Sequence, residues 1–448
     1  MKKASIIILF VWICSLGARA QSETVLPLFN DVFQSSFLNP ALTPDHRVSL
    51  GLPGISSVSF QMIHNGFVPN RFISNKDGRQ VLNTGQMLAH LAHQNMLHFG
   101  ADLDIFHLRI NVDQWNYWFA SRQKHSMSLF YPKDFVSLLL RGNADMVGQR
   151  FDFTPFGVEA NLYREFTFGA SRVWGPWVFG GRFSVLHGLA NLSLEPENIH
   201  IAVLNNDYEH SVATDFTLYS AGVPFDDDVD DEWIGDFLLR FRNPGFALSL
   251  GTVFRFDERT TFSVAINDIG FISWKDNTKH YRIRGEAVYN GIDIFANSSS
   301  GDDNDDSNGF MDDFLDNFTD EELEGGYRTW LPPKIYLSAS YRLAARTHAG
   351  FQFYSTVNRK HYPAVSLNLT QGVGRTWTVA TNVAFNQRSF ANFGLGLIFK
   401  PGPLQFYVVT DNYYAPLIDP LSLTNFNLRF GVNMVFGKLT EQQGLPYR

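Results

Sequence analysis

The chain has 448 residues, a formal net charge of -8 and 45% hydrophobic residues. A mean hydropathy of -0.12 excludes a bundle of apolar membrane helices, and the acidic balance offers no basic surface for nucleic acid. Aromatic residues make up 15% of the chain, with 42 Phe, which suits a large soluble core as well as the aromatic girdles of a membrane barrel.

Residues 1–20 have the pattern of a secretory signal peptide. Two lysines begin it, an apolar run follows, and residues 18–20 (A-R-A) match a small-x-small cleavage site. The mature chain is therefore expected to begin at Gln21. Cleavage removes Cys14, the single cysteine, so no disulfide, thiol nucleophile or cysteine metal ligand is expected in the mature protein.

An irregular segment follows, over residues 21–47, and it contains the tripeptide Asn39-Pro40-Ala41. Asn before Pro favours an extended or turn conformation over a helix. The adjacent Asp45 and His46 are interpreted as a turn-capping pair, with a proton relay as the alternative. The first strand is expected directly after this segment, over roughly residues 48–62.

Alternation of apolar and polar residues predicts most of the other strands, because successive side chains of a strand point to opposite faces. The predicted strands cover residues 99–105, 115–131 (broken near 123–125), 156–172, 177–192, 245–256, 262–266, 335–343, 365–369, 377–385, 393–399 and 404–408. Residues 199–220 fit either a further hairpin or an extended loop. Helical spacing is partial over 81–97 and a short helix is expected over 133–141.

The last predicted strand, residues 425–436, decides the fold class. Phe426, Leu428 and Phe430 begin a run of apolar residues at every second position, and polar residues fill the gaps. About ten residues of this alternation suffice for a tilted strand to cross a bilayer. Strands can do so only in a closed barrel, since lipid satisfies no backbone hydrogen bonds.

Connection lengths support the barrel independently. Counted back from the C-terminus, tight turns such as residues 257–259 and 400–403 alternate with longer connections. Outer-membrane barrels have short periplasmic turns, longer outer loops and an even strand number. The count is about 14 strands if residues 199–220 form a loop and 16 if they form a hairpin, and we adopt about 14. A soluble β-sandwich would not need this asymmetry.

The predicted organisation is thus an all-β, antiparallel transmembrane β-barrel in the outer membrane, with an N-terminal plug-like segment. The signal peptide is predicted over residues 1–20, the plug over 21–47, the barrel over 48–437 and a periplasmic tail over 438–448. The predicted outer loops of the barrel are residues 63–96, 132–150, 193–244, 275–333 and 411–424.

The Asn39-Pro40-Ala41 turn and this strand plan resemble the outer-membrane long-chain fatty-acid transporter family. Together with the run at residues 267–274 (N-D-I-G-F-I-S-W) they also resemble the related Bacteroidota barrels of type IX secretion. The resemblance implies about 14 strands and a segment before the first strand that plugs the barrel as a hatch. No substrate-contacting residue can be matched.

Alternation places several charges on the inner face. They are Asp102, Asp104, Glu159, Glu165, Arg182, Arg255, Arg342 and Arg429. Because both signs are present, we expect these charges to pair with one another and with the plug. The alternative is a selectivity lining.

An acidic run at residues 302–324 suggests a calcium site. Its candidate ligands follow EF-hand spacing and are Asn304, Asp306, Asn308, the Phe310 carbonyl and Asp312. Position one is Asn and the bidentate Glu at position twelve is replaced by Leu315, so affinity should be weak. A solvated acidic loop is an equal alternative. His90, His93 and His98 lack an identifiable partner ligand and are interpreted as loop histidines.

These observations predict a non-enzymatic outer-membrane barrel without a cofactor other than this calcium. The predicted function is a passive transporter or channel for a hydrophobic or small molecule, which would bind in the lumen. The alternative is a scaffold or accessory barrel of a type IX secretion or surface-assembly complex, which would bind a protein at the membrane or cell surface.

Overall fold

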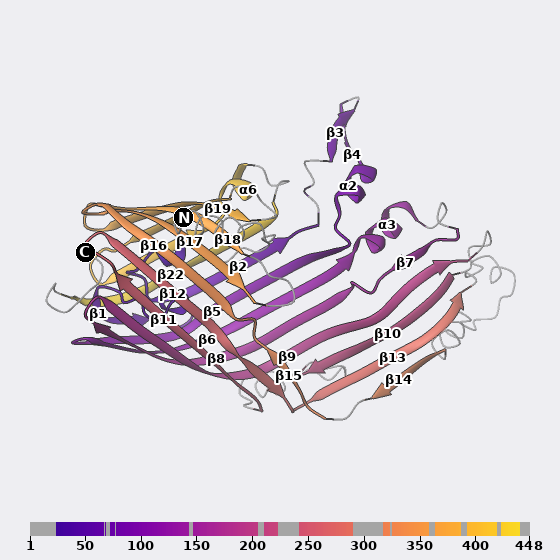
Figure 1. Cartoon of the computed structure of the whole chain (residues 1–448), viewed down its shortest axis with the longest axis horizontal. Coiled ribbons are helices and arrows are strands. Elements are labelled where there is room, and N and C mark those ends of the chain that lie inside the picture. Colours follow the sequence, from indigo (N-terminus) through magenta and orange to yellow (C-terminus); the bar gives the residue numbers. More distant parts are fainter. Residues whose placement is uncertain are drawn as a thin grey trace, which may run out of the picture.

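The computed structural model describes residues 24–66, 68, 72–76, 78–142, 147–204, 210–222, 242–289, 317–322, 325–357, 363–386, 392–418 and 423–439. These residues form a closed, antiparallel barrel of 14 strands (Figure 1). The predicted signal peptide and the five predicted calcium ligands lie outside the described residues.

The wall strands are given in order around the barrel. They are β1 (His46–Gly51) with β2 (Ser57–His64), β5 (Gln94–Val112), β6 (Trp115–Pro132), β8 (Gly157–Trp174), β9 (Trp177–Val203), β11 (Asn243–Arg255), β12 (Thr260–Trp274), β16 (Lys334–Ala344), β17 (Thr347–Thr356), β18 (Ala364–Val373), β19 (Trp377–Asn386), β20 (Asn392–Phe399), β21 (Leu404–Thr410) and β22 (Asn425–Lys438). β1 and β2 act as one interrupted wall strand, because both pair with β22 on one side and with β5 on the other.

The two ends of the barrel differ. At one end, the turn end, adjacent strands join through short connections such as residues 113–114, 175–176 and 345–346. The other end, the loop end, carries hairpin β3 (Ile73–Lys76) and β4 (Arg79–Leu82), and helices α2 (Thr84–His90), α3 (Lys133–Arg141) and α6 (Tyr414–Ile418). No described helix is both long and apolar enough to cross a membrane. The short helix predicted over 133–141 is confirmed as α3.

Part of the wall continues past the loop end as a curved sheet, the extension sheet. The second half of β9 pairs with β10 (His210–Ala221), which pairs with β13 (Thr278–Tyr289), which pairs with β14 (Phe318–Glu322). Small strands complete the edges: β7 (Arg150–Asp152) pairs with β9, and β15 (Tyr327–Trp330) pairs with the end of β12. Figure 1 shows the sheet reaching beyond the barrel.

The extension sheet corrects two predicted loops and resolves the strand count. Much of residues 193–244 and 275–333, predicted as outer loops, is strand. Residues 199–220 do contribute to a hairpin, β9 with β10, but this hairpin lies outside the closed wall. The barrel therefore keeps 14 strands, because β10, β13 and β14 pair only with the projecting part of β9 and with each other.

Two of the bulges in the wall strands change which charged side chains face the lumen. In β5 the register shifts between Asp104 and Phe106, so the inward positions move from 102 and 104 to 107, 109 and 111. In β12 the register shifts opposite Ser249, and Asp268 adopts a positive φ of 62°. Two consecutive residues, Asn267 and Asp268, thereby point inward. The break predicted near residues 123–125 is wrong, since β6 is continuous.

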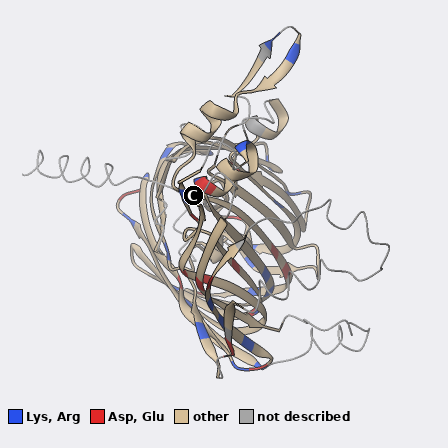
Figure 2. Ribbon diagram, turned by 90° about the vertical axis from the view of Figure 1, so that its right-hand side faces the viewer, with Lys and Arg blue, Asp and Glu red and all other residues tan. Residues whose placement is uncertain are grey.

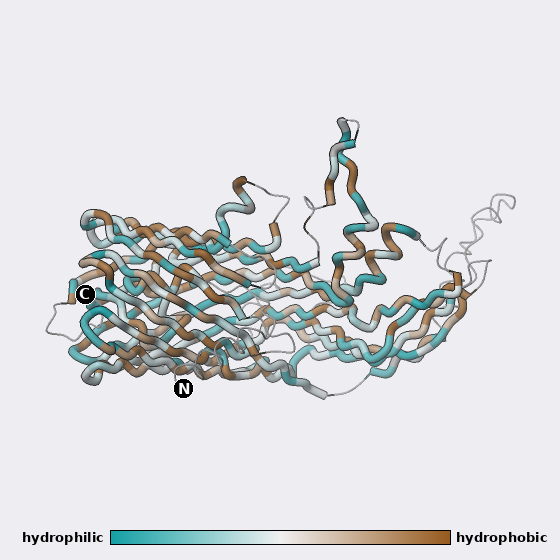
Figure 3. Tube along the Cα trace, turned by 45° about the horizontal axis from the view of Figure 1, so that its top comes forward, coloured by the Kyte–Doolittle hydropathy of each residue, from teal (hydrophilic) through white to brown (hydrophobic). Residues whose placement is uncertain are grey.

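The two faces of the wall have opposite character. The outer face exposes large apolar side chains along every part of the wall, among them Phe60, Phe183, Leu250, Leu367 and Phe430. The inner face buries polar residues instead. Brown and teal alternate along the wall strands in Figure 3. This inversion of the usual soluble pattern is what a surface in contact with lipid requires.

Candidate functional site

Residues 24–45 lie inside the barrel and form a plug. Two short 3-10 helices, η1 (Leu26–Leu28) and η2 (Phe33–Phe37), are its regular parts. Around η1, Val25 and Phe29 of the plug pack against Ile398 of β20 and Tyr407 of β21. Buried side chains of the plug form apolar clusters with three sectors of the wall: β19–β21, β6, and β9 with β11.

Wall side chains satisfy the plug's main-chain carbonyls. Arg182 donates to the Phe37 carbonyl at 2.9 Å, and Asn267 donates to the Leu38 carbonyl at 2.6 Å. Arg109 donates to the Leu42 carbonyl at 3.1 Å. These carbonyls have no regular secondary structure to pair them, and leaving one buried without a partner costs about 1–3 kcal/mol. The plug therefore depends on inward-facing donors of the wall.

The Asn39-Pro40-Ala41 turn fits against glycines of the wall. Asn39 Oδ1 accepts a hydrogen bond from the Ala41 backbone N–H at 2.9 Å, which closes the turn. A Cβ added at Gly180 of β9 would lie 2.4 Å from the Pro40 carbonyl carbon and the Ala41 nitrogen. A Cβ at Gly251 of β11 would lie 2.0 Å from Asn39 Oδ1. The absence of side chains at Gly180 and Gly251 creates the seat.

A network of buried charges lies beside the plug on the wall. Glu165 of β8 accepts from Arg122 at 2.7 Å and lies 3.3 Å from Lys124, both on β6. The Arg122 guanidinium also covers the Phe37 ring of the plug, 3.6 Å from its centroid. Lys124 also lies 3.9 Å from Asp268 of β12. This contact connects β6 with β12, two strands that are not neighbours in the wall.

Asp268 and Asp102 complete this charge network. Asp268 accepts from Arg182 at 2.5 Å and from Lys334 at 3.2 Å, and Arg429 lies 3.4 Å from Asp102. Figure 2 shows both signs of charge along the wall. Opposite charges at these distances neutralise one another, which is the requirement for burying them in a confined lumen.

The predicted inner charges divide into two groups. Asp102, Asp104, Glu165, Arg182 and Arg429 lie at the plug or in the charge network beside it: Arg182 contacts the plug directly, and Asp104 accepts from Gln34 at 3.2 Å. Glu159 is exposed toward the loop end, and Arg255 and Arg342 lie toward the turn end.

Four members of the network were missed by reading the sequence. They are Arg122, Lys124, Asp268 and Lys334. The first two would have been found by treating β6 as unbroken, since they alternate with Trp118 and Ala120. Asp268 has no such signal, because simple alternation after Val264 and Ile266 assigns it to the outer face.

Within the described part of the lumen, the plug leaves a larger and a smaller hollow space. A larger cavity of about 650 Å³ lies between the plug and β12–β19 toward the turn end. A smaller one of about 120 Å³ lies among the charge network. Leu38 of the plug and Tyr336 of β16 line both spaces, so these two side chains form the partition between them.

An apolar layer lies around this partition. Ile63 and Met96 of β2 and β5 belong to one buried cluster with Tyr336, Tyr354 and Ala364 of β16–β18. β2 and β5 lie across the barrel from β16–β18 in the strand order, so the cluster spans the lumen. Leu38 packs against it. A molecule moving along the barrel axis must pass this layer.

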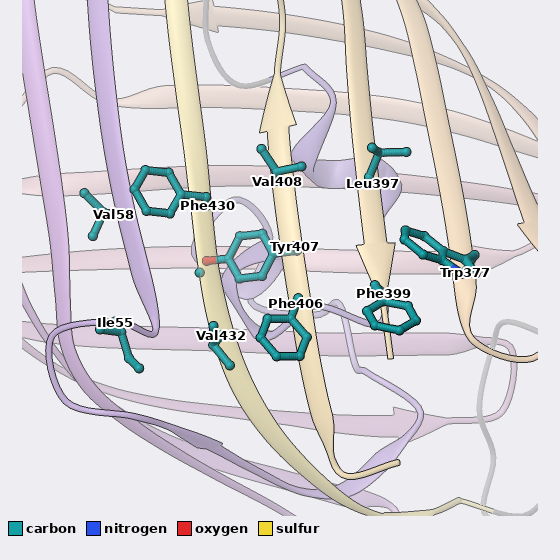
Figure 4. A pocket seen from close by; sticks show the side chains of 11 residues that line it. Ile55, Val58, Trp377, Leu397, Phe399, Phe406, Tyr407, Val408, Phe430 and Val432 are labelled. Atoms are coloured by element: carbon teal, nitrogen blue, oxygen red, sulfur yellow. The ribbon is translucent and has the colours of Figure 1, made fainter. Parts of the chain in front are cut away.

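The interruption between β1 and β2 produces an apolar groove on the outer face. The groove has a volume of about 460 Å³, and its lining includes Ile55, Phe406, Val408 and Phe430 (Figure 4). Behind it the Tyr407 hydroxyl donates to the Ser56 carbonyl at 3.0 Å, and Gln34 of the plug donates to the same carbonyl at 3.1 Å. One tyrosine and one backbone segment therefore separate the groove from the plug.

A charged cluster at the turn end brings together the middle of the plug, at Asp31, and its C-terminal end, at Asp45. His46 lies 3.0 Å from Asp45 and 3.0 Å from Lys400 of the β20–β21 turn. Burial, reinforced by the charge of Asp45, raises the pKa of Asp31 to about 6. Burial alone would also raise the pKa of Asp45, but the contact with His46 and the Lys400 charge hold it well below its usual value.

The described residues include no group of three or more His, Asp or Glu side chains that could hold a metal ion. His90 is on α2, and its Nδ1 lies 2.9 Å from the Gln86 carbonyl. His93 lies 3.4 Å from Asp152, and His98 lies 2.9 Å from the Ser128 hydroxyl. Calcium binding by the acidic run stays a prediction.

A family model described as a family of unknown function, DUF5723, matches residues 40–411. No curated protein matches the chain. Several solved barrels are similar in structure. The Ralstonia pickettii toluene transporter TbuX is 8% identical with a TM-score of 0.44, over 94% of this chain and 97% of that one.

Two further examples come from Pseudomonas. A Pseudomonas aeruginosa FadL homologue is 11% identical with a TM-score of 0.42, over 94% of this chain and 99% of that one. The P. putida toluene transporter TodX is 8% identical with a TM-score of 0.41, over 89% and 93%. With TM-scores below 0.5, these similarities carry no argument about function.

Replacing Gly180 with Ala should loosen the plug, because the new methyl group would meet the backbone of Pro40 and Ala41. Hydrogen exchange of residues 39–43, followed by mass spectrometry, should become faster. Gly181→Ala is the matched control, since its Cβ would only approach Leu250 at 3.7 Å. Equal exchange in both variants would show that the turn does not depend on this seat.

Raising the pH from about 4 to about 6 should weaken the plug. Asp31 binds its proton more tightly in the folded protein, with a pKa of about 6 against 3.8 unperturbed, so its protonation stabilises the folded state and this contribution disappears as the pH rises. Asp45 acts in the opposite sense, but only at lower pH. The midpoint of heat-dependent electrophoretic mobility should fall across this window, and the fall should be smaller in Asp31→Asn. An identical pH profile in the variant would contradict the assignment.

Proposed function

This chain belongs to the family of unknown function DUF5723, and we propose from its own geometry that it is an outer-membrane barrel that acts as a passive channel for a small or hydrophobic molecule. The observation that carries the proposal is the pair of hollow spaces along the barrel axis with a thin partition between them. Leu38 and Tyr336 are the side chains common to both spaces.

The outer face supports the location in the outer membrane. Its apolar band is bordered at the turn end by outward aromatic residues, which include Trp115, Trp174, Trp177 and Trp377. Trp177 stacks on Phe254 with ring centroids 4.2 Å apart, and Trp377 stacks on Phe399 at 4.4 Å. Aromatic girdles of this kind mark the membrane interface of bacterial barrels. In this orientation the turn end faces the periplasm.

The plug supports a channel with a restricted passage. It is held by hydrogen bonds and apolar contacts to separate strands, and part of the wall, β12 to β18, meets it across the larger cavity. Movement of one plug residue, Leu38, would connect the two spaces without releasing the arginine contacts to Phe37 and Leu42. The path is narrow, so only small molecules would pass.

The groove at the strand interruption supports a hydrophobic cargo. It lies on the face assigned to lipid and ends at Tyr407 and Ser56, directly outside the plug. An apolar molecule in the membrane would be accommodated there by Phe406 and Phe430. The lack of an enzymatic activity stays a prediction. A scaffold role in type IX secretion or surface assembly, with a protein partner, stays the alternative offered by the sequence.

Placing a charge on the outer face should destabilise the barrel. Phe430 is mid-strand on β22 and 42% exposed, so Phe430→Arg should cost about 2–4 kcal/mol near the bilayer midplane. Denaturant-dependent folding into lipid vesicles measures this. Phe430→Leu is the control, because it keeps an apolar side chain at the same position of the outer face. Equal losses would mean that the outer face does not meet lipid.

Shortening the partition should increase permeation. Leu38→Ala removes the side chain shared by the two spaces and should raise the swelling rate of proteoliposomes in small uncharged solutes several-fold. Leu28→Ala removes the same atoms from the plug but borders only the larger cavity, so it should leave the rate near that of the wild type. No increase for Leu38→Ala, or the same increase for both, would refute an axial path.

A further inference from the structure

The larger cavity is lined by polar side chains on its wall side and mainly by apolar side chains on its plug side. On the wall side, strands β12 and β16–β18 contribute uncharged polar residues, namely Thr261, Ser263, Ser338, Ser340, Gln352, Asn368 and Thr370. On the plug side the lining is largely apolar, with Pro27, Leu28, Phe29, Leu38 and Leu42. One face of the cavity thus offers hydrogen bonds and the other offers apolar contact.

Charge is confined to one end of this cavity. The charged residues among its described lining are Asp31, Asp45, Arg346, Arg375, Lys400 and Lys438. Asp31 and Asp45 belong to the plug, and the other four lie in short connections or at the end of the last strand, all at the turn end of the barrel. The interior is neutral, in contrast to the charge network on the opposite side of the plug. An ion in the interior would be buried without a partner.

The side-chain amide of Gln352, in the lining of the cavity, has an unpaired donor and an unpaired acceptor among the described residues. The Gln352 side chain is only 2% exposed, and neither Oε1 nor Nε2 has a hydrogen-bond partner there. The Oδ1 of Asn368, on the neighbouring strand, is also buried and unpartnered. A buried amide left unpaired is unfavourable. A guest that presents both a donor and an acceptor would satisfy these atoms, and a hydrocarbon would not.

We propose that this cavity binds an uncharged amphiphile, a molecule with an apolar body and an amide or hydroxyl group, and that Gln352 and Asn368 bind the polar group. The proposal rests on the channel function and narrows its cargo. A volume of about 650 Å³ lies within the range of small-molecule sites, roughly 300–1,000 Å³. The apolar body would lie on Leu28 and Phe29 of the plug.

Three probes with one carbon skeleton test the chemistry: 4-phenylbutanamide, 4-phenylbutanoate and butylbenzene. Equilibrium binding is measured on the full-length barrel in lipid nanodiscs, with empty nanodiscs subtracted. The amide should bind at least ten-fold more tightly than the carboxylate and the hydrocarbon. Equal or tighter binding of either of these, or no binding of the amide, overturns the proposal.

Variants identify the site. Gln352→Leu keeps the side-chain size and removes the amide, so the preference for 4-phenylbutanamide should fall about ten-fold while butylbenzene binding is unchanged or stronger. Gln371→Leu is the control, because Gln371 is bonded to Thr347 at 2.7 Å outside the cavity lining. A retained preference in Gln352→Leu overturns the proposal, and the wild-type comparison decides the matter even if a variant fails to fold.

Permeation separates this proposal from the channel function. Amide binding without any flux of 4-phenylbutanamide into proteoliposomes would leave the site in place and refute the channel. Flux of all three probes at equal rates, with equal affinities, would leave the channel in place and refute the amphiphile site.

Discussion

Arg182 joins the plug to the wall, and much of the lumen is arranged around that contact. Its guanidinium donates to the Phe37 carbonyl and to Asp268 at the same time. A buried guanidinium needs a carboxylate nearby, and a carboxylate in this position needs further cations, which Lys124 and Lys334 supply. The charge network is therefore the consequence of using an arginine to hold irregular backbone inside a barrel.

The position of this network divides the lumen. Most of the charges and the arginine contacts to the plug lie on the side of β5 to β12, and apolar packing holds η1 on β19 to β21. The wall between them, β16 to β18, carries serine, glutamine and asparagine and has the larger cavity in front of it. The unequal attachment of the plug explains why the larger empty space lies on this side, and why its interior is neutral.

The sequence was informative where side chains follow strict alternation. The closing strand, the tight turns and the 14-strand wall depend only on that period, which burial on one face and lipid on the other impose. Reasoning failed at bulges. Asn267 and Asp268 both point inward because one extra residue is inserted opposite Ser249. An alternating pattern of apolar and polar residues gives no sign of such an insertion.

The prediction of the plug and of the extension sheet from the sequence was limited by a different cause. The seat for Pro40 is made by glycines about 140 and 210 residues further along the chain, a relation that only tertiary structure reveals. Strands β10 and β13 alternate less clearly than the wall strands, since the extension sheet carries polar residues on its surfaces, such as Asp215 paired with Arg282 at 3.0 Å. Their residues therefore resembled loops.

The interrupted first strand also has a consequence for assembly. β1 and β2 follow the plug directly and close the barrel against β22, and Gln34 of the plug bonds Asn433 of β22, 399 residues away. The contacts of residues 24–45 reach strands from β5 to β22, so an already closed cylinder would have to admit the segment through its end and form all of them afterwards. A simpler order is that the segment is enclosed while the first and last strands are still apart. The entropy lost on joining the two ends of so long a chain is then offset by one folding event that completes both seam and interior.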